Sequence, residues 1–318
     1  MIAPDTLFAG TLPLVDGVFI SGTSVNPDYD QHTSEAFSEK WASLEQSTED
    51  EDEGWKRLQF DWYLRCYGYA SEAELRDTLA DKKLVLDAGC GPGYKAAWFA
   101  RLCPKTVVVA MDISESVQLA ARRYTSLPNL VFVRGDIART PFRDGAFDLI
   151  SCDQVLHHTI SPPDTLREFD RILAPSGLLN TYVYARKALP RELLDEHLRD
   201  YAKVLDRDQL WALADQLTTL GKRLSDLNIT IDVPEMPALG INGGPQDLQR
   251  FIYWNFIKCF WNPDYGFDAS RLTNFDWYAP SIAYRYTRDE FTKMLTEAGF
   301  TAEFLHSEEA CHTGRFRK

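Results

Sequence analysis

The stretch Leu84–Tyr94, LVLDAGCGPGY, decides the fold of this chain. Its first residues, Leu84 to Leu86, form a short apolar run that predicts a buried strand. Asp87 follows, glycines then occupy every second position, and a helical pattern begins at Tyr94. A strand, a glycine-rich turn and a helix in this order form the opening of a nucleotide-binding unit.

The residues of this turn also indicate what kind of ligand it holds. Glycines carry no Cβ, so the backbone can turn tightly and approach a ligand closely. Asp87 places a carboxylate at the end of the strand, where it can face a cationic group. The combination suits a ligand with an adenosine half and a positively charged half.

The register of the glycines distinguishes between nucleotide ligands. A dinucleotide fingerprint requires G-x-G-x-x-G. Counting from Gly89, the third glycine would fall at position 94, which is Tyr94. The pattern D-x-G-x-G-x-G therefore makes a dehydrogenase the least favoured enzyme class.

Further strands with polar residues at their ends follow along the chain. Residues 106–111, 130–134, 147–152 and 178–184 predict strands, separated by helices predicted over 114–124 and 164–173. Asp112 ends the first of these strands, about twenty residues past the turn, where a carboxylate can accept hydrogen bonds from both ribose hydroxyls. Asp136 and Asp153 follow the next two strands. The alternation predicts a doubly wound α/β sheet.

The order and spacing of these elements over residues 82–186 resemble the small-molecule type of class I S-adenosylmethionine-dependent methyltransferases, with Asp87–Gly93 resembling their motif I. The resemblance implies a Rossmann-like, seven-stranded sheet with S-adenosylmethionine as the cofactor. It implies that Asp136 contacts the adenine amino group and that the next residue flanks the ring. The cofactor-binding residues expected on this basis are Asp87, Ala88, Gly89, Cys90, Gly91, Gly93, Asp112, Ile113, Asp136, Ile137, Asp153 and Gln154.

The rest of the chain divides around this core. We expect an N-terminal loop and helical extension over residues 1–81, the cofactor-binding core over 82–186, an insert over 187–285 and a C-terminal completion of the core over 286–318. In the superfamily, such additions usually cover the edge of the sheet where the methyl group would lie. The insert is helical by pattern and rich in aromatic residues, with a Pro/Gly-rich loop over 229–245 that we expect to move. Most of its aromatic residues should be packing, and a few should line a substrate pocket; the candidates are Trp254, Asp276, Trp277, Tyr278 and Tyr284.

Methyl transfer from a sulfonium asks little chemistry of the protein, because alignment and water exclusion supply much of the rate. An acceptor hydroxyl or ammonium must still lose its proton. His157 and His158 follow the strand over 147–152 and are candidates for the general base, although histidines at this position in the family often serve structure. No Asn-Pro-Pro-Tyr motif follows this strand, which argues against the nucleic-base and glutamine amide N-methyltransferases.

Composition narrows the possible partners. The 318 residues carry a formal net charge of −13, which disfavours nucleic acid. No apolar run reaches membrane-spanning length, and Asp5 and Asp16 interrupt the N-terminal apolar stretch, so we expect no membrane association and no signal peptide. The six cysteines are scattered without a C-x-x-C pair, which indicates reduced thiols in a cytoplasmic protein and no metal site.

The sequence thus predicts a cytoplasmic methyltransferase for a small-molecule acceptor. Oxygen is favoured as the methylated atom, with nitrogen or carbon next, in secondary-metabolite or polysaccharide biosynthesis. Two alternatives remain: methylation of RNA or protein, and a catalytically silent S-adenosylmethionine-binding scaffold. The acceptor and the oligomeric state stay open.

Overall fold

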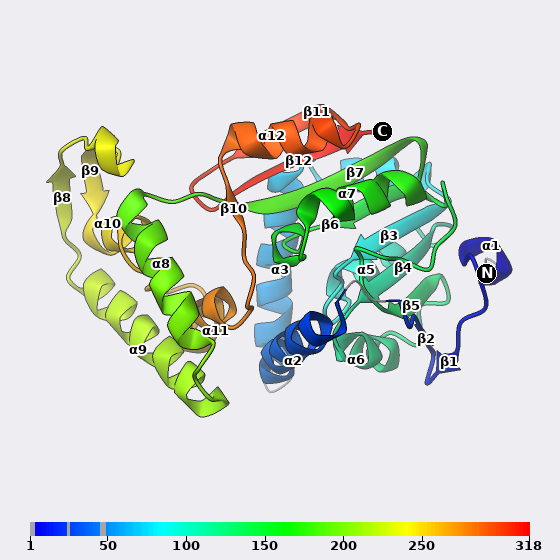
Figure 1. The fold of residues 1–318 in the computed structure, drawn as a ribbon, viewed down its shortest axis with the longest axis horizontal. Helices are drawn as coiled ribbons and strands as arrows, with labels where there is room; N and C mark the ends of the chain where they lie inside the picture. The colour runs from blue at the N-terminus through cyan, green and yellow to red at the C-terminus, as the bar shows by residue number, and fades with distance from the viewer. Residues whose placement is uncertain (1–3, 24–25, 45–48) are drawn as a thin grey trace. The chain divides into compact units, whose positions relative to one another are not determined.

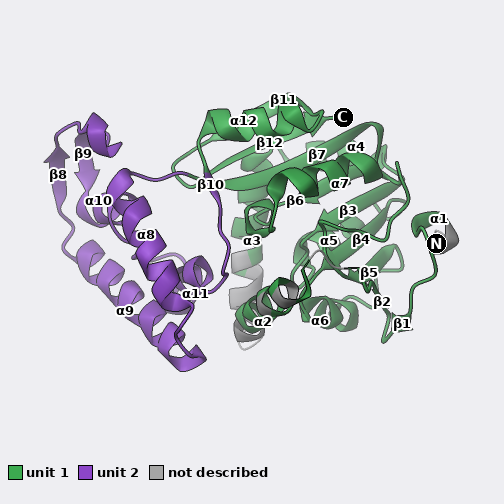
Figure 2. Cartoon of the chain, in the orientation of Figure 1, with its two compact units in different colours: residues 1–185, 286–318 green, residues 186–285 purple. Residues whose placement is uncertain are grey.

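A computed structural model of the chain describes residues 4–23, 26–44 and 49–318 (Figure 1). It divides into two compact units (Figure 2). Unit 1 contains Met1–Ala185 and Tyr286–Lys318, and unit 2 contains Arg186–Arg285. Each unit is described by itself below. The four-part functional division expected from the sequence stays a prediction.

Unit 1 is built on a sheet whose strands follow the order β1-β2-β5-β4-β3-β6-β7-β12-β11, with β10 beside β7. The strands from β2 to β7 in this order are parallel, whereas β12 is antiparallel to both β7 and β11, and β1 is antiparallel to β2. The strand bounds are β1 Leu14–Val15, β2 Val18–Ile20, β3 Leu84–Ala88, β4 Val107–Asp112, β5 Leu130–Arg134, β6 Phe147–Cys152, β7 Leu173–Ala185, β10 Arg285–Tyr286, β11 Thr301–Ser307 and β12 Cys311–Arg317.

The doubly wound α/β class is confirmed, but the strand count is not. Seven strands, from β5 to β11 in the spatial order, form the predicted sheet, and β1, β2 and β10 extend it to ten among the described residues. The hairpin β1–β2 extends the sheet beyond β5, because β2 pairs in parallel with β5 and places Val18 opposite Phe132. The final strand β12 was not located from the sequence, because residues 311–317 mix small, basic and aromatic side chains without a clean alternation.

Helices cover both faces of the sheet, and alternate residues of the central strands build two cores. In β3, Val85 packs into the core formed with α3, α4, α5 and α6. Leu84 and Leu86 point the other way, into the core formed with α1, α7 and α12. This is the pattern expected for a parallel strand buried on both faces. The bounds are α1 Pro4–Leu7, α5 Tyr94–Leu102, α6 Ser116–Arg123, α7 Pro162–Ile172 and α12 Arg288–Glu297, with a short 3-10 turn η1 at Leu156–His158.

Helical capping signals in the sequence predicted two helix starts correctly. Ser71 accepts a hydrogen bond from the Glu74 backbone at the start of α4, and Thr287 and Glu290 form a reciprocal capping box at the start of α12. The helix predicted over 114–124 begins two residues later, at Ser116, with Glu115 as the residue before it. Ser114 instead bonds to Asp112, as described below.

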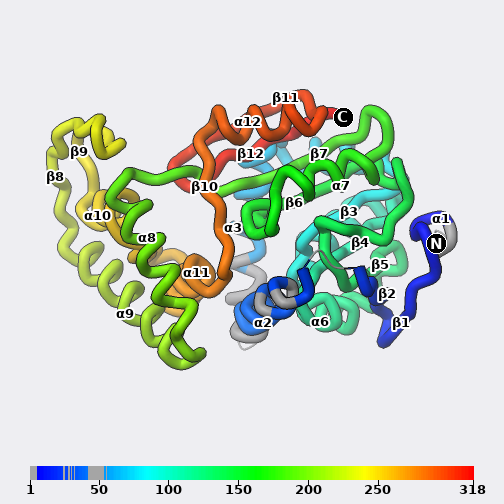
Figure 3. Tube along the Cα trace, in the orientation of Figure 1, coloured from blue at the N-terminus to red at the C-terminus, as the bar shows by residue number. Residues whose placement is uncertain are grey.

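The N-terminal extension is more helical than predicted. Helices α2 (Pro27–Leu44), α3 (Glu49–Cys66) and α4 (Glu72–Ala80) precede β3, as the tube in Figure 3 traces. Helix α3 already begins at Glu49. Residues 1–3 and 24–25 of the predicted N-terminal loop lie outside the described part of the chain.

Unit 2 is mainly helical, with α8 (Leu189–Ala202), α9 (Arg207–Asp226), α10 (Leu248–Asn255) and α11 (Gly266–Tyr278). The sequence predicts a loop over 229–245, and this prediction is wrong. The segment forms the hairpin of β8 (Thr230–Val233) and β9 (Gly244–Asp247), with a 3-10 turn η2 at Pro237–Leu239 between the two strands. Its Val233 and Ile241 pack in a small core with Ala188. None of the described helices is both long and apolar enough to cross a membrane.

Candidate functional site

The glycine-rich turn after β3 adopts backbone conformations that favour glycine. Gly89, Gly91 and Gly93 have φ values of 81°, 52° and 77°. The Gly89 and Cys90 amides both donate to the Met111 carbonyl, at 2.8 and 3.0 Å, which fixes the turn against β4. A Cβ at Gly89 would lie 2.3 Å from Cγ2 of Val155. Glycine is therefore required here by backbone angle and by space. Ala88 and Cys90 of the same turn are buried.

Asp112, at the end of β4, holds this turn in place. Its Oδ2 accepts a hydrogen bond from the Gly91 amide at 2.7 Å. Its Oδ1 accepts from the Ser114 amide at 2.8 Å and from the Ser114 hydroxyl at 2.5 Å. Burial raises the pKa of Asp112, and these hydrogen bonds oppose the rise. Oδ2 accepts only the one hydrogen bond from Gly91 among the described residues and can accept a second, so the group keeps capacity for a ligand.

The end of β5 lies beside Asp112. The Gly135 amide donates to the Asp112 carbonyl at 2.9 Å, and Asp136 Oδ1 accepts from the Ala138 amide at 2.8 Å. Ile137 is buried, and Ile113 is half-buried. The two acidic residues predicted to hold ribose and adenine therefore follow neighbouring strands at one edge of the sheet.

A buried charged cluster lies at the ends of β3 and β6. Lys95, on the first turn of α5, forms an ion pair with Asp153 Oδ2. Asp153 Oδ1 accepts from the Tyr67 hydroxyl at 2.8 Å, and Gln154 Nε2 lies 3.3 Å from Asp153 Oδ2. Gln154 itself is exposed and adopts a φ of 64°, in the left-handed region. Sequence reasoning missed Lys95 and Tyr67.

Asp87 completes this cluster. Burial raises its pKa to about 7, and the neighbouring Lys95 ammonium opposes the rise. Its Oδ2 is buried and has no hydrogen-bond partner among the described residues. A buried carboxylate oxygen without a partner is costly, so this atom marks a position where a cationic or hydrogen-bond-donating ligand group would be stabilised.

Helix α2 lies against the same turn. A Cβ on Gly91 would be 2.8 Å from Cε2 of Trp41, so the indole packs directly on the turn. The Ser38 hydroxyl accepts from the Glu115 amide at 3.1 Å, and the Lys40 ammonium lies 4.5 Å from the Trp41 ring centre. The sequence placed Phe37 and Trp41 on one helix face but offered no signal that this face covers the glycine-rich turn.

The two candidate bases lie in an aromatic cluster after β6. The His157 ring centre is 3.8 Å from that of Tyr184, and the His158 ring contacts the edge of Phe37 at 5.3 Å. The Tyr29 hydroxyl donates to the His158 carbonyl. His157 is fully buried and His158 nearly so. The structure thus brings His158, and less directly His157, beside residues of α2.

The substrate candidates of unit 2 occupy different environments. Trp277 Nε1 and the Tyr278 hydroxyl both donate to the buried Asp195 carboxylate, at 2.9 and 2.7 Å. Their polar atoms are therefore used inside unit 2, which favours a packing role. Asp276 and Trp254 are half-buried, with the Lys187 ammonium 5.2 Å from the Trp254 ring centre, and Tyr284 is exposed.

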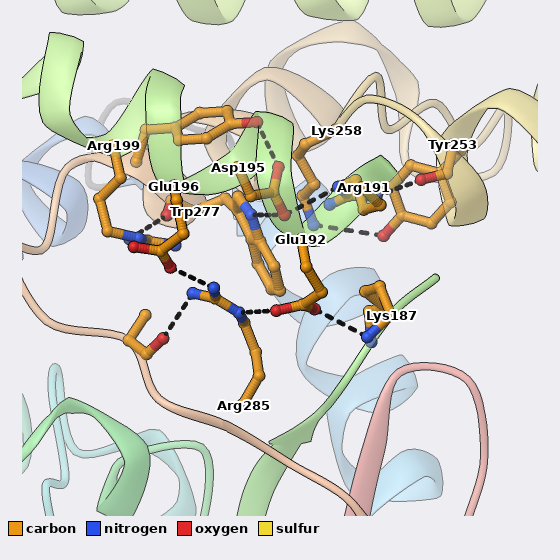
Figure 4. A network of polar contacts seen from close by, with 12 residues as sticks. Lys187, Arg191, Glu192, Asp195, Glu196, Arg199, Tyr253, Lys258, Trp277 and Arg285 are labelled. Carbon is orange, nitrogen blue, oxygen red and sulfur yellow. Dashed lines mark hydrogen bonds and ion pairs between the residues drawn. The ribbon is translucent and has the colours of Figure 1, made fainter. Parts of the chain in front are cut away.

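Asp195 belongs to a larger polar network in unit 2 (Figure 4). Arg191 Nε donates to Asp195 Oδ2 at 2.8 Å, and Arg199 Nη1 donates to the Trp277 carbonyl at 2.8 Å. Lys258 Nζ lies 3.2 Å from the Tyr253 hydroxyl and 4.5 Å from the Trp277 ring centre. Burial and the neighbouring Arg191 lower the pKa of Lys258 to about 7.

Comparison with known proteins identifies the core of unit 1. A family model described as a methyltransferase domain matches residues 86–181. Over these residues the chain carries a methyltransferase domain and resembles the class I S-adenosylmethionine-dependent methyltransferases. The match spans the glycine-rich turn, Asp112, Asp136, the end of β6 and the larger part of β7, and the cofactor of this superfamily is S-adenosylmethionine.

Individual relatives resemble the same core. An uncharacterized 37.1 kDa protein in transposon TN4556 of Streptomyces fradiae is 40% identical over 97 residues, which are 30% of this chain and 28% of that protein. A malonyl-[acyl-carrier protein] O-methyltransferase of Legionella pneumophila subsp. pneumophila is 36% identical over 96 residues, 30% of this chain and 34% of that protein. The chain thus spans about a third of the length of these curated relatives.

A solved structure resembles nearly the whole chain. The 1,6-didemethyltoxoflavin-N1-methyltransferase of Burkholderia thailandensis, bound to 1,6-didemethyltoxoflavin and S-adenosylhomocysteine, has a TM-score of 0.50 and 14% identity, covering 94% of this chain and 92% of that one. At this identity the likeness concerns the fold alone.

The residues at the sheet edge fit the superfamily's cofactor. S-adenosylmethionine carries ribose hydroxyls, a sulfonium and an ammonium. Asp112 offers acceptors, and Asp87 offers a buried carboxylate oxygen that lacks a partner among the described residues. The glycine turn brings backbone to this edge with no Cβ in the way. The donor and acceptor set of the site therefore matches the chemistry of the ligand.

Proposed function

We propose that this chain transfers a methyl group from S-adenosylmethionine to a small-molecule acceptor, with oxygen favoured over nitrogen and carbon. The observation that carries the proposal is the cofactor edge: three carboxylates, Asp87, Asp112 and Asp136, at the ends of three neighbouring parallel strands around a glycine-rich turn. When bound, the cofactor would supply an electrophilic methyl group on a cationic sulfur.

The chain's own residues have three tasks in this proposal. Asp112 accepts hydrogen bonds from the ribose and Asp136 from the adenine amino group. Asp87 Oδ2 receives the ammonium of the cofactor, which compensates a buried negative charge. Helix α2 excludes water from the turn through Trp41, so that alignment and desolvation can carry most of the rate.

We further propose His158 as the general base for acceptors that must lose a proton. His158 is favoured over His157 because His157 is fully buried against Tyr184, whereas His158 lies beside Phe37 of α2. A base has to reach the proton that it removes. Trp254, Asp276 and Tyr284 remain candidate acceptor contacts in unit 2, for which we propose a substrate-binding lid role.

Oxygen as the methylated atom draws support from the named activity of the Legionella pneumophila relative, an O-methyltransferase. Nitrogen is the second candidate and carbon the third. A role in secondary-metabolite or polysaccharide biosynthesis, in the cytoplasm, completes the proposal. Free, buried cysteines throughout the chain are consistent with that compartment.

The test is formation of S-adenosylhomocysteine. The purified full chain is incubated with S-adenosylmethionine and a panel of small hydroxyl, carboxyl and amine acceptors, and the product is measured by mass spectrometry. We expect methylation of at least one oxygen acceptor. Gly91→Val should abolish it, because a side chain there meets Trp41 at a φ of 52°, and the exposed Lys293→Met on α12 should not.

The alternatives give different results in the same experiment. A scaffold without catalysis would bind S-adenosylmethionine, measured by calorimetry, and form no product with any acceptor. Methylation of RNA or protein would appear as label on added macromolecule and not on the small acceptors. Absence of cofactor binding would overturn the proposed function altogether.

A further inference from the structure

Three ionisable side chains are almost completely buried where β3 and β6 end. Asp87 is 1% exposed, Lys95 5% and Asp153 7%. Two carboxylates and one ammonium leave this cluster one positive charge short. Burying an uncompensated charge is costly, so the cluster is arranged to receive a cation.

The two carboxylates are not equivalent. Asp153 is occupied on both oxygens, by the Lys95 ammonium and Gln154 on Oδ2 and by the Tyr67 hydroxyl on Oδ1. Asp87 Oδ2 has no hydrogen-bond partner among the described residues. The pairing of Lys95 with Asp153 therefore decides which carboxylate is left for a ligand.

We infer that Lys95 is a positioning residue: by occupying Asp153 it directs the ammonium of the cofactor to the unpartnered Oδ2 of Asp87. The inference rests on the proposed function, since it needs a ligand that carries an ammonium.

The groups around Asp87 show why Lys95 is needed. Those that face it are Lys95 and Tyr94 of α5, Cys90 of the turn, Asp112 of β4, and Cys152 and Asp153 at the end of β6. Of these, Lys95 is the one cation. Burial raises the pKa of Asp87 to about 7, Asp153 and Asp112 raise it, and Lys95 lowers it. Without Lys95 the carboxyl would be protonated at neutral pH and could not pair with an ammonium.

The experiment compares two ligands that share the adenosine part. S-adenosylhomocysteine carries the amino-acid ammonium, and 5′-methylthioadenosine lacks the amino-acid group. Calorimetry gives the affinity of each between pH 5.5 and 7.5. With a pKa of about 7 for Asp87, the ionised fraction falls about 25-fold over this range, and the apparent affinity for S-adenosylhomocysteine should fall equally relative to that for methylthioadenosine.

Two variants should shift this pH profile in opposite directions. Lys95→Met removes the cation, so the midpoint should move up by about one pH unit or more, with S-adenosylhomocysteine binding at pH 7.5 weakened about threefold or more. Asp153→Asn frees Lys95 to pair with Asp87, so binding should weaken while its pH dependence largely disappears. Methylthioadenosine affinity should stay unchanged in both, and Lys293→Met should behave as wild type. If Lys95→Met does not fold, Asp153→Asn carries the test.

The outcomes separate this inference from the proposed function. Opposite shifts in the two variants, seen with S-adenosylhomocysteine alone, support it. Binding of both ligands with a pH-independent affinity ratio overturns the role of Lys95 and leaves the proposed function standing. An unchanged pH midpoint in Lys95→Met, or the same shift in both variants, also overturns it. No binding of either ligand overturns both.

Discussion

Asp112 has two tasks, and two measurements on one variant can separate them. In the structure its carboxylate receives three hydrogen bonds, from the Gly91 amide and from the Ser114 amide and hydroxyl. In the proposed function it also accepts from the ribose. Asp112→Ala removes all of these acceptors at once.

The two tasks have different magnitudes. Loss of three hydrogen bonds to a buried carboxylate, partly offset by removal of the buried charge, should lower the free energy of unfolding by about 2–4 kcal/mol. Loss of the ribose contacts should weaken S-adenosylhomocysteine binding by a further 1.5–3 kcal/mol, roughly 10- to 150-fold, on the scale of charge-assisted hydrogen bonds. Urea unfolding measures the first quantity and calorimetry the second.

Methylthioadenosine and its 2′-deoxy analogue isolate the ribose contact. In wild type, removing the 2′-hydroxyl should weaken binding, and in Asp112→Ala it should cost almost nothing, because the partner is already gone. Ser114→Ala is the matched control, since it loosens the same turn but keeps the carboxylate. An equal cost of the 2′-hydroxyl in wild type and Asp112→Ala would refute the ribose assignment and leave Asp112 as a structural clamp.

Three further predictions follow from close contacts and buried charges. Gly89→Ala should destabilise the protein by more than the roughly 1–2 kcal/mol that the left-handed backbone alone costs, because the new Cβ would lie 2.3 Å from Val155. Gly10→Ala is the control, since no atom lies within 4 Å of its Cβ position, and it should be nearly neutral. Thermal unfolding measures both. Asp195→Asn leaves Arg191 as an uncompensated buried cation and should lower the free energy of unfolding by about 3–5 kcal/mol. Trp277→Phe loses one hydrogen bond and should lower it by about 1 kcal/mol. The reverse order would contradict the network in unit 2. The pKa of Lys258 is about 7 in the folded chain and near 10.4 in the unfolded chain. The unfolded chain therefore binds more protons between these pH values, and the free energy of unfolding should rise by about 2 kcal/mol from pH 7 to 9. Lys258→Met should remove this rise, and an identical pH profile of stability in both proteins would contradict the role of Lys258.

The elements that sequence patterns predicted well are those whose signal is local. Leu84–Leu86 form an apolar run that only a buried strand accommodates, and the glycine spacing fixes the turn that follows. The side-chain cap at Ser71 and the capping box at Thr287 each pair residues three positions apart, so sequence alone specifies them. In these cases the interaction that forms the element is contained within a few residues.

Parts of the site that depend on distant contacts could not be predicted this way. Lysines are almost never fully buried unless they are paired, so nothing near Lys95 in the sequence indicates that its partner is Asp153, 58 residues away. Trp41 shows an amphipathic helix face, but the chain does not state that this face packs on Gly91. The sequence therefore located the strand, turn and helix that frame the candidate site but not the contacts of Lys95 and Trp41, and the roles of the candidate site residues stay predictions.

Helix α8 shows why hydrophobic periodicity can predict the wrong buried face of a helix. The helical spacing of its apolar residues, including Leu193 and Tyr201, predicts a buried face. In the structure Leu193 is 65% and Tyr201 52% exposed. Of its four buried residues, three are the charged Arg191, Asp195 and Arg199, spaced four residues apart, and the fourth is Ala202. Hydrophobic periodicity assumes that burial favours apolar groups, and this assumption fails where charged groups satisfy one another. Here Asp195 of α8 accepts from Arg191 of the same helix and from Trp277 and Tyr278 of α11, so the two helices are tied by directional bonds that fix their register. An apolar core of equal volume could supply as much stability but would not impose that register, because dispersion contacts have no direction.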